Sequence, residues 1–598
     1  MMRKEYYIAL GIIALCLSYI FFTNQQYLSI FGMAGIFALA ILAALLFVIP
    51  SVYPHRIEKP IYLGASALIL VILGGYEYLF DLLSPGTLGT ILHVSILIGI
   101  ATIISIAGIY AIARWAHKQK GAKSQLVVFA GLVVVALLAY SAMYVINHVQ
   151  WSGVDEVGYN YYAAYLLVHG QNPYSASMEP ILAQRGIFPT VQLNGTYEFA
   201  YDYPALSFLA YLPIPLLGIT SFFSFIFLVV LFTIIASYIV YYRSAREKRI
   251  LIPLAIWIVV SYALIGVATQ YLAVSILLLL AYIYRDMPLV SGVALGLSAS
   301  AIQLVWFALP FFYVLMYREK GSGKMFTQLL ATLAVFLLIN GYFLIAYPGA
   351  IGNILSIFGL GKLPAYGSNI MQFVVAFYQL PSWYSAVISI LCFAVLLSLY
   401  FAYTSTLRPL FVVVPMMIFF LSWRNISIYG LPFIPLLLAV YSSREKEPKD
   451  IVKSRLPIAI CLAAVVVIGL AVAVLAHQAY ASQPGIKIDS ALPILSVQQG
   501  YGSMQFSMIG LRVLVNNTSD KNEPISFYII SRSPNNNGYI LGSTLNESMA
   551  HSASNYTIDF QLALVGNTTR IFVEAFSPDY TASKTLNLTN LGKGVSYP

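Results

Sequence analysis

The sequence predicts an all-α polytopic membrane protein of roughly 13–15 transmembrane helices with an external all-β sandwich domain at its C-terminal end. The 598-residue chain is 60% hydrophobic and only 9% charged, and its mean hydropathy is +0.82. Apolar runs recur as far as residue 480. They are about 20 residues long, the length that an α-helix needs to cross a bilayer. From residue 485 the pattern changes to short alternating runs, which are typical of strands.

The distribution of basic residues predicts the orientation. Residues 1–480 hold 25 Lys and Arg against 15 Asp and Glu, whereas residues 481–598 hold seven of each. The excess lies in short loops between apolar runs, which indicates membrane orientation and not nucleic-acid binding. The positive-inside rule therefore places the N-terminus in the cytoplasm, together with four basic loops: 114–123, 243–249, 318–324 and 444–455.

This orientation predicts the elements in order. Five spans bring the chain outside: 6–22, 31–50, 61–80, 88–113 and 125–147. An external loop at 148–204 and an interfacial stretch at 205–217 precede three further spans: 219–241, 250–267 and 271–285. Residues 289–317 lie between two cytoplasmic markers, so we expect two short helices that meet near Gln303. A span at 326–347 is followed by a second external loop at 348–383. Four further spans then follow, at 384–404, 409–421, 429–441 and 456–479.

A domain boundary is predicted between residues 480 and 481. The last span leaves residues 481–598 outside the cell, where four alternating runs predict strands: 504–515, 525–531, 556–564 and 570–575. Asn-x-Ser/Thr triplets fit an external, glycosylated surface and begin at six positions: Asn516, Asn517, Asn546, Asn555, Asn567 and Asn587. These triplets, the low charge and the absence of cysteine outside suggest an archaeal cell surface.

The external loop 148–204 collects acids in a chain that has few. No carboxylate occurs between Asp81 and the loop, which then holds five: Asp155, Glu156, Glu179, Glu198 and Asp202. Carboxylates beside a bilayer are usually functional. We expect Asp155 to act as a general base, and Asp202 to approach it from the other end of the loop. Glu179 and Glu198 are interpreted as solvated loop acids, and the neighbouring tyrosines as an aromatic belt at the membrane interface.

Few basic side chains face outward in the membrane part: Arg185, Lys362 and Arg424. A guanidinium at headgroup height can bind a lipid phosphate through two hydrogen bonds, and this is the role we consider for Arg424. The alternative is an interfacial anchor whose charged end reaches the headgroups. No metal-ligand set is evident beyond Asp155, Glu156 and Asp202, so no cofactor is predicted and a divalent metal stays open.

The order of these motifs resembles the GT-C glycosyltransferases, which use polyprenyl-phosphate sugars as donors. An Asp-Glu pair opens a large external loop, Gly-Gln-Asn-Pro-Tyr follows, and Tyr-Asp-Tyr-Pro closes it before the next membrane segment. The resemblance covers residues 125–440 and includes the Gly-rich segment 288–317. It is closest to the protein mannosyltransferase and lipid A aminoarabinose transferase branches and to the mannosyltransferases that depend on polyprenol-phosphate mannose.

The resemblance implies a role for each matching residue. Asp155 matches the catalytic base, with Glu156 as its partner, and Asp202 with Tyr203 matches the end of the loop that builds the substrate site. Gln303 matches a position near the donor, and Arg424 matches a basic residue near the lipid phosphate. Lys362 is a second candidate for contacting the phosphate. Two departures stand out. The Trp-Trp-Asp-Tyr-Gly motif of oligosaccharyltransferases is absent, and Ile302-Gln303 replaces a frequent lysine-proline pair.

The expected function is therefore transfer of a sugar from a polyprenyl-phosphate (dolichyl-phosphate) donor to a lipid, glycan or protein acceptor at the outer face of the cell membrane. Two alternatives remain. A transporter or flippase for a lipid-linked sugar would need polar groups in mid-membrane, whereas the main acid in a span, Glu77, lies near an outer end. A structural membrane protein that displays the β domain would not need an acid-rich loop so early in the chain.

Overall fold

The computed structural model is mostly helical with a smaller sheet component. It describes the following residues: 4–23, 30–52, 155–185, 198–218, 223–244, 253–254, 256–258, 269–356, 366–367, 382–407, 411–413, 418–419, 422, 424–425, 427–442, 485–500, 503–518, 522–531, 540–543, 549–550, 554–561, 570–576 and 581–587. The spans predicted at 61–80, 88–113, 125–147 and 456–479 lie outside these residues, as does most of the span at 250–267.

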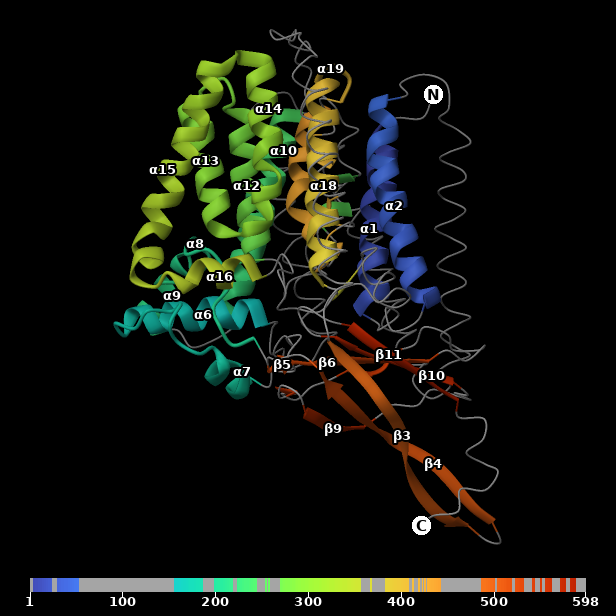
Figure 1. Ribbon diagram of the computed structural model, residues 1–598. Coiled ribbons are helices and arrows are strands. Elements are labelled where there is room, and N and C mark those ends of the chain that lie inside the picture. The colour runs from blue at the N-terminus through green and yellow to red at the C-terminus, as the bar shows by residue number, and fades with distance from the viewer. Residues whose placement is uncertain are drawn as a thin grey trace.

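Long helices run side by side to form a bundle (Figure 1). Several match predicted spans to within a few residues: α1 (Lys4–Thr23), α2 (Ile30–Val52), α10 (Phe223–Ser244), α12 (Thr269–Ile283), α15 (Ser322–Ala346) and α18 (Ser382–Ala402). Where a single predicted span was expected at 429–441, a 3-10 turn, η5 (Ser427–Phe433), leads into the short helix α21 (Ile434–Ser442). A continuous hydrophobic core joins α1, α2, α10, α12, α18 and α21, because their apolar side chains face one another. No residue of α15, all of which the structure describes, belongs to this core.

The Gly-rich segment forms two short helices, as predicted. Helix α13 (Pro288–Ala301) ends where Ile302 adopts an extended backbone (φ −153°, ψ 134°), and the 3-10 turn η3 (Gln303–Phe307) then leads into α14 (Leu309–Lys320). The Ile302 N–H still bonds the Ser298 carbonyl at 3.2 Å, but the extended backbone of Ile302 ends the helical conformation, and the chain reverses at this point. The reversal brings both helix ends close to Gln303.

Glycines allow α13 to lie directly against α15. A Cβ atom on Gly292 would come within 2.5 Å of the Gln328 carbonyl oxygen, and one on Gly296 within 2.8 Å of the Thr332 carbonyl oxygen. Three hydrogen bonds between described residues cross this close interface. Gln328 Nε2 donates to Ser291 Oγ at 2.7 Å, Thr332 Oγ1 donates to the Gly292 carbonyl at 3.1 Å, and Asn340 Nδ2 donates to Ser300 Oγ at 3.1 Å. Small residues with interhelical hydrogen bonds are the usual contact between helices in membranes.

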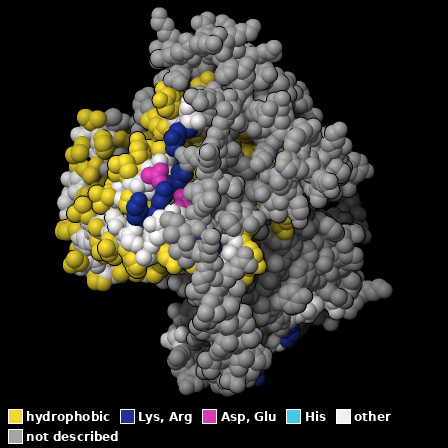
Figure 2. All heavy atoms as spheres, turned by 90° about the horizontal axis from the view of Figure 1, so that it is seen from above, with side chains coloured by type: hydrophobic (Ala, Val, Ile, Leu, Met, Phe, Trp, Pro, Cys, Tyr) yellow, Lys and Arg dark blue, Asp and Glu magenta, His cyan; other side chains and the backbone are white. Residues whose placement is uncertain are grey.

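One end of the bundle is covered by short helices that lie across it (Figure 1). The two loops predicted to be external supply α6 (Asp155–Val168), α7 (Glu179–Arg185) and α16 (Gly349–Ser356). The stretch predicted to be interfacial supplies α8 (Leu206–Leu209) and α9 (Pro213–Leu216). Their buried side chains form a second hydrophobic core together with Phe343 of α15. The opposite end carries the turn between α14 and α15, where charged side chains gather inside a rim of hydrophobic ones (Figure 2).

Among the described residues, α15 is the one helix long and apolar enough to cross a membrane. Shorter apolar helical stretches accompany it, including Tyr7–Ser18, Ala38–Val48, Ala273–Ile283 and Ser389–Ala402. The outward side of α15 is apolar, with Leu338 and Ile345 each 83% exposed and Tyr342 72% exposed. The larger number of transmembrane helices stays a prediction.

Every element described from residue 486 onward is a strand. Strands β3 (Ile486–Gly500), β4 (Ser503–Asn517) and β9 (Ser554–Gln561) form one antiparallel sheet. A second antiparallel sheet has the order β11 (Thr581–Asn587), β10 (Arg570–Phe576), β6 (Ser526–Ser531) and β7 (Ile540–Ser543). A short pair, β5 (Glu523–Pro524) and β8 (Met549–Ala550), completes the described strands. The predicted runs at 504–515, 525–531 and 570–575 coincide closely with β4, β6 and β10.

Alternate residues of both sheets share one core. The buried side chains follow a period of two along β4, β6 and β10, as in Leu511, Val513 and Val515. This alternation is the pattern from which the strands were predicted. One surface prediction is wrong: the Asn517 side chain is fully buried, because β4 turns it inward opposite Ile486, so it cannot belong to an exposed sequon surface.

Candidate functional site

Helix α6 begins with the two acids that the sequence singles out. Asp155 is half-buried, and its carboxylate accepts a hydrogen bond from the backbone N–H of Glu156 at 2.9 Å. Glu156 is 4% exposed and therefore faces the interior. The N-terminus of a helix carries unpaired N–H groups and a positive partial charge, so it stabilises carboxylates at this position. Asp155 is thus the more accessible acid of the pair.

The other end of the loop returns to the same place. Burial raises the pKa of the Tyr159 hydroxyl on α6, and three surrounding carboxylates raise it further: Asp155, Asp202 and Glu198. Burial likewise raises the pKa of the Tyr203 hydroxyl, with further contributions from Asp202, Glu156 and Asp155. Both phenols stay neutral because a phenolate would be desolvated beside negative charges. The structure therefore brings Asp155, Glu156, Asp202 and Tyr203 together around neutral hydroxyl groups.

Hydrogen bonds from the bundle fix the segment that carries Asp202. Gln303 is fully buried at the turn between α13 and α14, and its Nε2 donates to the Asp202 carbonyl at 2.9 Å. Asn340 of α15 accepts a hydrogen bond from the backbone N–H of Ala205 at 2.7 Å. Ser207 of α8 donates to the Ala301 carbonyl at the end of α13. Gln303 is therefore a support for the Asp202 backbone in this structure.

The segment lies below the end of the bundle. Asn340 precedes the end of α15 at Ala346 by six residues, which at about 1.5 Å per residue is roughly 9 Å along the helix. The turn between the short helices α13 and α14 contacts this segment, because Gln303 donates to the Asp202 carbonyl. Asp202 therefore lies near this end of the bundle, three residues before the Ala205 that bonds Asn340.

The loop tyrosines are mostly buried, contrary to the prediction of an interfacial belt. Tyr159, Tyr174 and Tyr201 are 4%, 2% and 0% exposed. Tyr201 donates a hydrogen bond to Asn160 Oδ1 at 2.6 Å, and Tyr174 donates to the Tyr203 carbonyl at 2.7 Å. Their rings pack edge to face at 5.3 Å, which places the polar hydroxyls inside a hydrophobic core. The tyrosines thus hold the loop in a defined conformation.

Glu198 also differs from its prediction as a solvated acid. It is 5% exposed, its carboxylate accepts a hydrogen bond from the Ala200 N–H at 3.0 Å, and its carbonyl accepts one from the Tyr159 hydroxyl. A buried carboxylate needs such partners to offset lost hydration. Glu179, by contrast, is exposed at the start of α7, as predicted.

The predicted cations are described less fully. Lys362 lies outside the described residues, and the side chain of Arg424 is also outside them. The backbone of Arg424 forms the short strand β2 (Arg424–Asn425), which pairs in parallel with β1 (Tyr366–Gly367) of the second predicted external loop. The two segments that carry Lys362 and Arg424 therefore approach each other close to residues 366 and 424.

Two tyrosines at the site were not predicted. Tyr271 at the start of α12 interacts with Glu156 and Asp155, and its ring stacks on Tyr429 of η5 with centroids 6.1 Å apart. Both rings are buried, at 3% and 6% exposure. Through this stack the acids of α6 contact the segment that follows Arg424. In the sequence both residues resemble ordinary apolar-span tyrosines, so no local signal separates them from the other tyrosines of the chain.

The arrangement can accept a proton and orient a hydroxyl group. A half-buried carboxylate, Asp155, stands among neutral phenols, and the Gln303 Oε1 atom nearby is buried without a hydrogen-bond partner among the described residues. In the described part of the chain, no group of three or more His, Cys, Asp or Glu side chains is placed to hold a metal ion. Comparison with protein-family models, curated proteins and solved structures finds no match to this chain.

Proposed function

We propose that the protein is a polytopic membrane glycosyltransferase of the GT-C kind. It transfers a sugar from a polyprenyl-phosphate carrier to an acceptor hydroxyl at the outer face of the membrane. The observation that carries the proposal is the convergence of Asp155, Glu156, Asp202 and Tyr203 at one end of the bundle. Acids from both ends of a long loop are held there by bonds to the helical bundle.

The membrane location rests on the outer surface of the bundle. The exposed side of α15 presents large apolar side chains over its whole length, among them Leu330, Leu338 and Ile345. A soluble protein would expose a continuous apolar surface of this kind only at an interaction site. In a bilayer the same surface contacts lipid tails. The helices α1, α2, α10, α12 and α18 would then cross the membrane beside α15, with the β-sandwich and α6 on the outer side.

The proposed reaction needs a base and a place for the donor phosphate. Asp155 accepts the proton of the acceptor hydroxyl, whose oxygen attacks the anomeric carbon of the donor sugar. The bond between that carbon and the phosphate oxygen breaks, and the electron pair leaves with the lipid phosphate. Arg424 and Lys362 remain the candidates for binding the phosphate.

The depth of the segment that carries Asp202 suits a donor anchored in lipid. The Ala205 N–H, three residues from Asp202, bonds Asn340 at a point roughly 9 Å from the end of α15. A polyprenyl-phosphate sugar in the outer leaflet has its phosphate at headgroup level and reaches such a depth without leaving the membrane. The transporter alternative requires ionisable groups in mid-membrane, and no observation on the described helices favours it.

The test is sugar transfer by purified protein in liposomes supplied with radiolabelled polyprenyl-phosphate sugars. Asp155→Asn keeps the size of the side chain and its hydrogen bond to the Glu156 N–H but cannot accept a proton. We expect the turnover number to fall by about 10²–10⁴, the usual contribution of a general base. Glu179→Gln is the matched control, because Glu179 is an exposed acid of the same loop. Equal turnover of Asp155→Asn and wild type would remove Asp155 as the base.

A further inference from the structure

Helix α6 carries a row of aromatic side chains that the proposed reaction does not use. Tyr162, Tyr165 and His169 follow one another at spacings of three and four residues, so they are neighbours on one face of the helix. The ring centroids of Tyr162 and Tyr165 lie 6.0 Å apart with their planes 10° from parallel. Those of Tyr165 and His169 lie 4.0 Å apart with the planes tilted by 34°. These three side chains form the aromatic row.

The aromatic row faces outward. Tyr165 is 40% exposed, His169 is exposed and Tyr162 is half-buried. The other side of α6 is buried, including Val157 and Ala163, and the helix packs on α8 and α9, which lie on its bundle side (Figure 1). Tyr165 and His169 therefore contribute little to holding α6 in place, and their exposed rings are available to a ligand.

The row lies on the same face of α6 as the proposed base. Asp155, Tyr162 and His169 are separated by seven residues each, which is close to two helical turns. At 3.6 residues per turn, Asp155 and the whole row lie within an arc of roughly 80° around the helix axis. At about 1.5 Å per residue, the row begins roughly 10 Å from Asp155 and ends about 21 Å from it. It therefore leads away from Asp155 along the helix.

Polar atoms accompany the rings. His169 Nδ1 lies 2.8 Å from the Tyr165 carbonyl, so Nδ1 carries the hydrogen and Nε2 of the neutral ring is an acceptor. The chain turns at Gly170 (φ 76°), and the exposed Gln171 follows, its backbone fixed by a bond of 2.9 Å from its N–H to the Leu166 carbonyl. The surface thus combines flat apolar ring faces with hydrogen-bonding groups at their edges.

We propose that the aromatic row binds the carbohydrate part of the acceptor, as a short oligosaccharide that lies along α6 with its reactive end toward Asp155. A sugar ring has an apolar C–H face that stacks on an aromatic ring, and hydroxyl groups around its rim that bond polar neighbours. The role as acceptor site rests on the proposed function, whereas the binding of carbohydrate does not. A membrane-interface role for the row fits less well, because α8 and α9 lie on the bundle side of α6 and the apolar surface of the bundle is on α15.

The test is the binding of neutral oligosaccharides to the full-length protein in nanodiscs, measured by saturation-transfer NMR without any donor lipid. The probes are short oligosaccharides of mannose, glucose, galactose and N-acetylglucosamine. We expect at least one of them to bind the wild type. Tyr165→Ala should raise its dissociation constant roughly 3- to 10-fold, the contribution of one aromatic contact. Tyr165→Phe keeps the ring and should keep most of the affinity.

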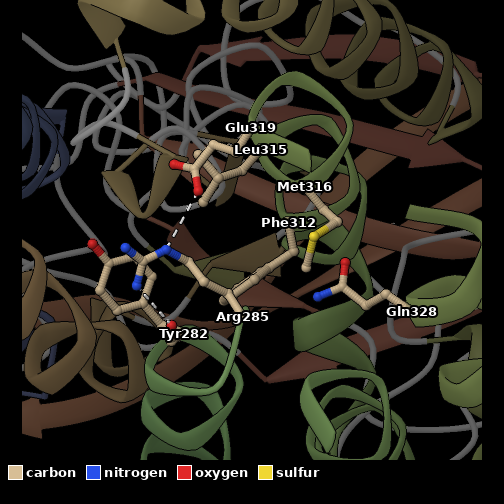
Figure 3. A pocket seen from close by; sticks show the side chains of 7 residues that line it. All are labelled: Tyr282, Arg285, Phe312, Leu315, Met316, Glu319 and Gln328. Carbon is tan, nitrogen blue, oxygen red and sulfur yellow. Dashed lines mark hydrogen bonds and ion pairs between the residues drawn. The ribbon is translucent and has the colours of Figure 1, made fainter. Parts of the chain in front are cut away.

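The matched control is Tyr284→Ala. Tyr284 is 44% exposed, close to the exposure of Tyr165, but it lies just after α12 at the opposite end of the bundle, next to the Arg285–Glu319 ion pair (Figure 3). This variant should bind the oligosaccharides as the wild type does. If no probe binds the wild type, or if Tyr165→Ala binds as tightly as Tyr284→Ala, the proposal is wrong.

A second variant covers the case in which Tyr165→Ala fails to fold. His169→Ala shortens the row and keeps Tyr165, and it should also weaken binding; unchanged binding would then overturn the proposal. The outcome is separate from that of the transfer test on Asp155→Asn, because the probes bind without any transfer. A wild type that binds the probes and transfers no sugar would refute the proposed function and leave the carbohydrate site standing.

Discussion

Asn340 is the side chain whose loss should most directly free the segment that carries Asp202. It is 1% exposed on α15 and accepts the hydrogen bond from the Ala205 N–H at 2.7 Å. Ala205 is fully buried, so in Asn340→Leu its N–H has neither a protein partner nor water. An unsatisfied buried donor of this kind costs about 1–3 kcal/mol. Leucine has a similar volume, which keeps the packing contribution small.

The other bonds of Asn340 change this magnitude little. Ser300 Oγ loses the donor at 3.1 Å but still donates to the Gly296 carbonyl at 2.8 Å, so it keeps a partner. The Phe336 carbonyl belongs to the helical ladder of α15 and keeps its backbone bond. The expected destabilisation therefore comes mainly from Ala205 and is local to residues 198–218.

Hydrogen–deuterium exchange of the protein in detergent micelles or nanodiscs measures this effect. A local cost of about 1–3 kcal/mol corresponds to roughly 5- to 150-fold faster exchange of the segment in Asn340→Leu. Leu338→Ala is the control, because Leu338 is 83% exposed on the same helix and contacts no part of the segment's hydrogen bonding. If peptides from 198–218 exchange at the same rate in Asn340→Leu and Leu338→Ala, the Ala205 bond does not hold the segment and the reasoning is wrong.

Three further predictions follow from single contacts. Gly292→Val should separate α13 from α15 and lower the free energy of unfolding by about 1–3 kcal/mol, as measured by denaturant titration. Gly341→Val is the control, because a Cβ atom at Gly341 meets no atom within 4 Å. The pKa of Tyr159 is raised above its ordinary value of 10.0 in the folded protein, so the free energy of unfolding should fall as the pH rises above 10.0. The Tyr159→Phe variant should lose less stability over the same pH range. Equal losses in the variant and the wild type would contradict this. Mass spectrometry of glycosylated protein should find glycan on Asn516 and none on Asn517, which is fully buried; glycan on Asn517 contradicts the strand register.

The parts of the fold that the sequence predicts are those with a local pattern. The reversal near Gln303 was predicted because the segment 289–317 lies between two cytoplasmic markers, so the chain must enter the membrane and return. Strands β4, β6 and β10 were predicted because their apolar residues alternate. Asp155 and Asp202 were expected to meet because they lie at the two ends of one loop.

The contacts that hold the site have no local pattern. Asn340 bonds a residue 135 positions away, and Gln303 bonds one 101 positions away. A lone Asn or Gln in an apolar helix gives no indication of its partner. Glu198 was interpreted as a solvated acid because it lies in a loop, whereas the Ala200 N–H supplies a partner two residues along and allows its burial. Tyr271 and Tyr429 are hidden among many similar tyrosines.

The helices α13 and α14 depend on polar contacts at both ends, and this follows from their composition. Helix α13 consists mainly of Gly, Ala and Ser, so it offers little apolar surface with which to hold its position against α15. Hydrogen bonds are stronger where water is excluded, and they fix a helix pair more firmly than small side chains can. At one end Gln328 bonds Ser291 beside the Arg285–Glu319 pair, and at the other end Asn340 bonds Ser300 and Ala205. Because the Gln303 turn joins α13 to α14, the contacts at both ends determine where the Gln303 amide lies, and through it the position of the Asp202 backbone.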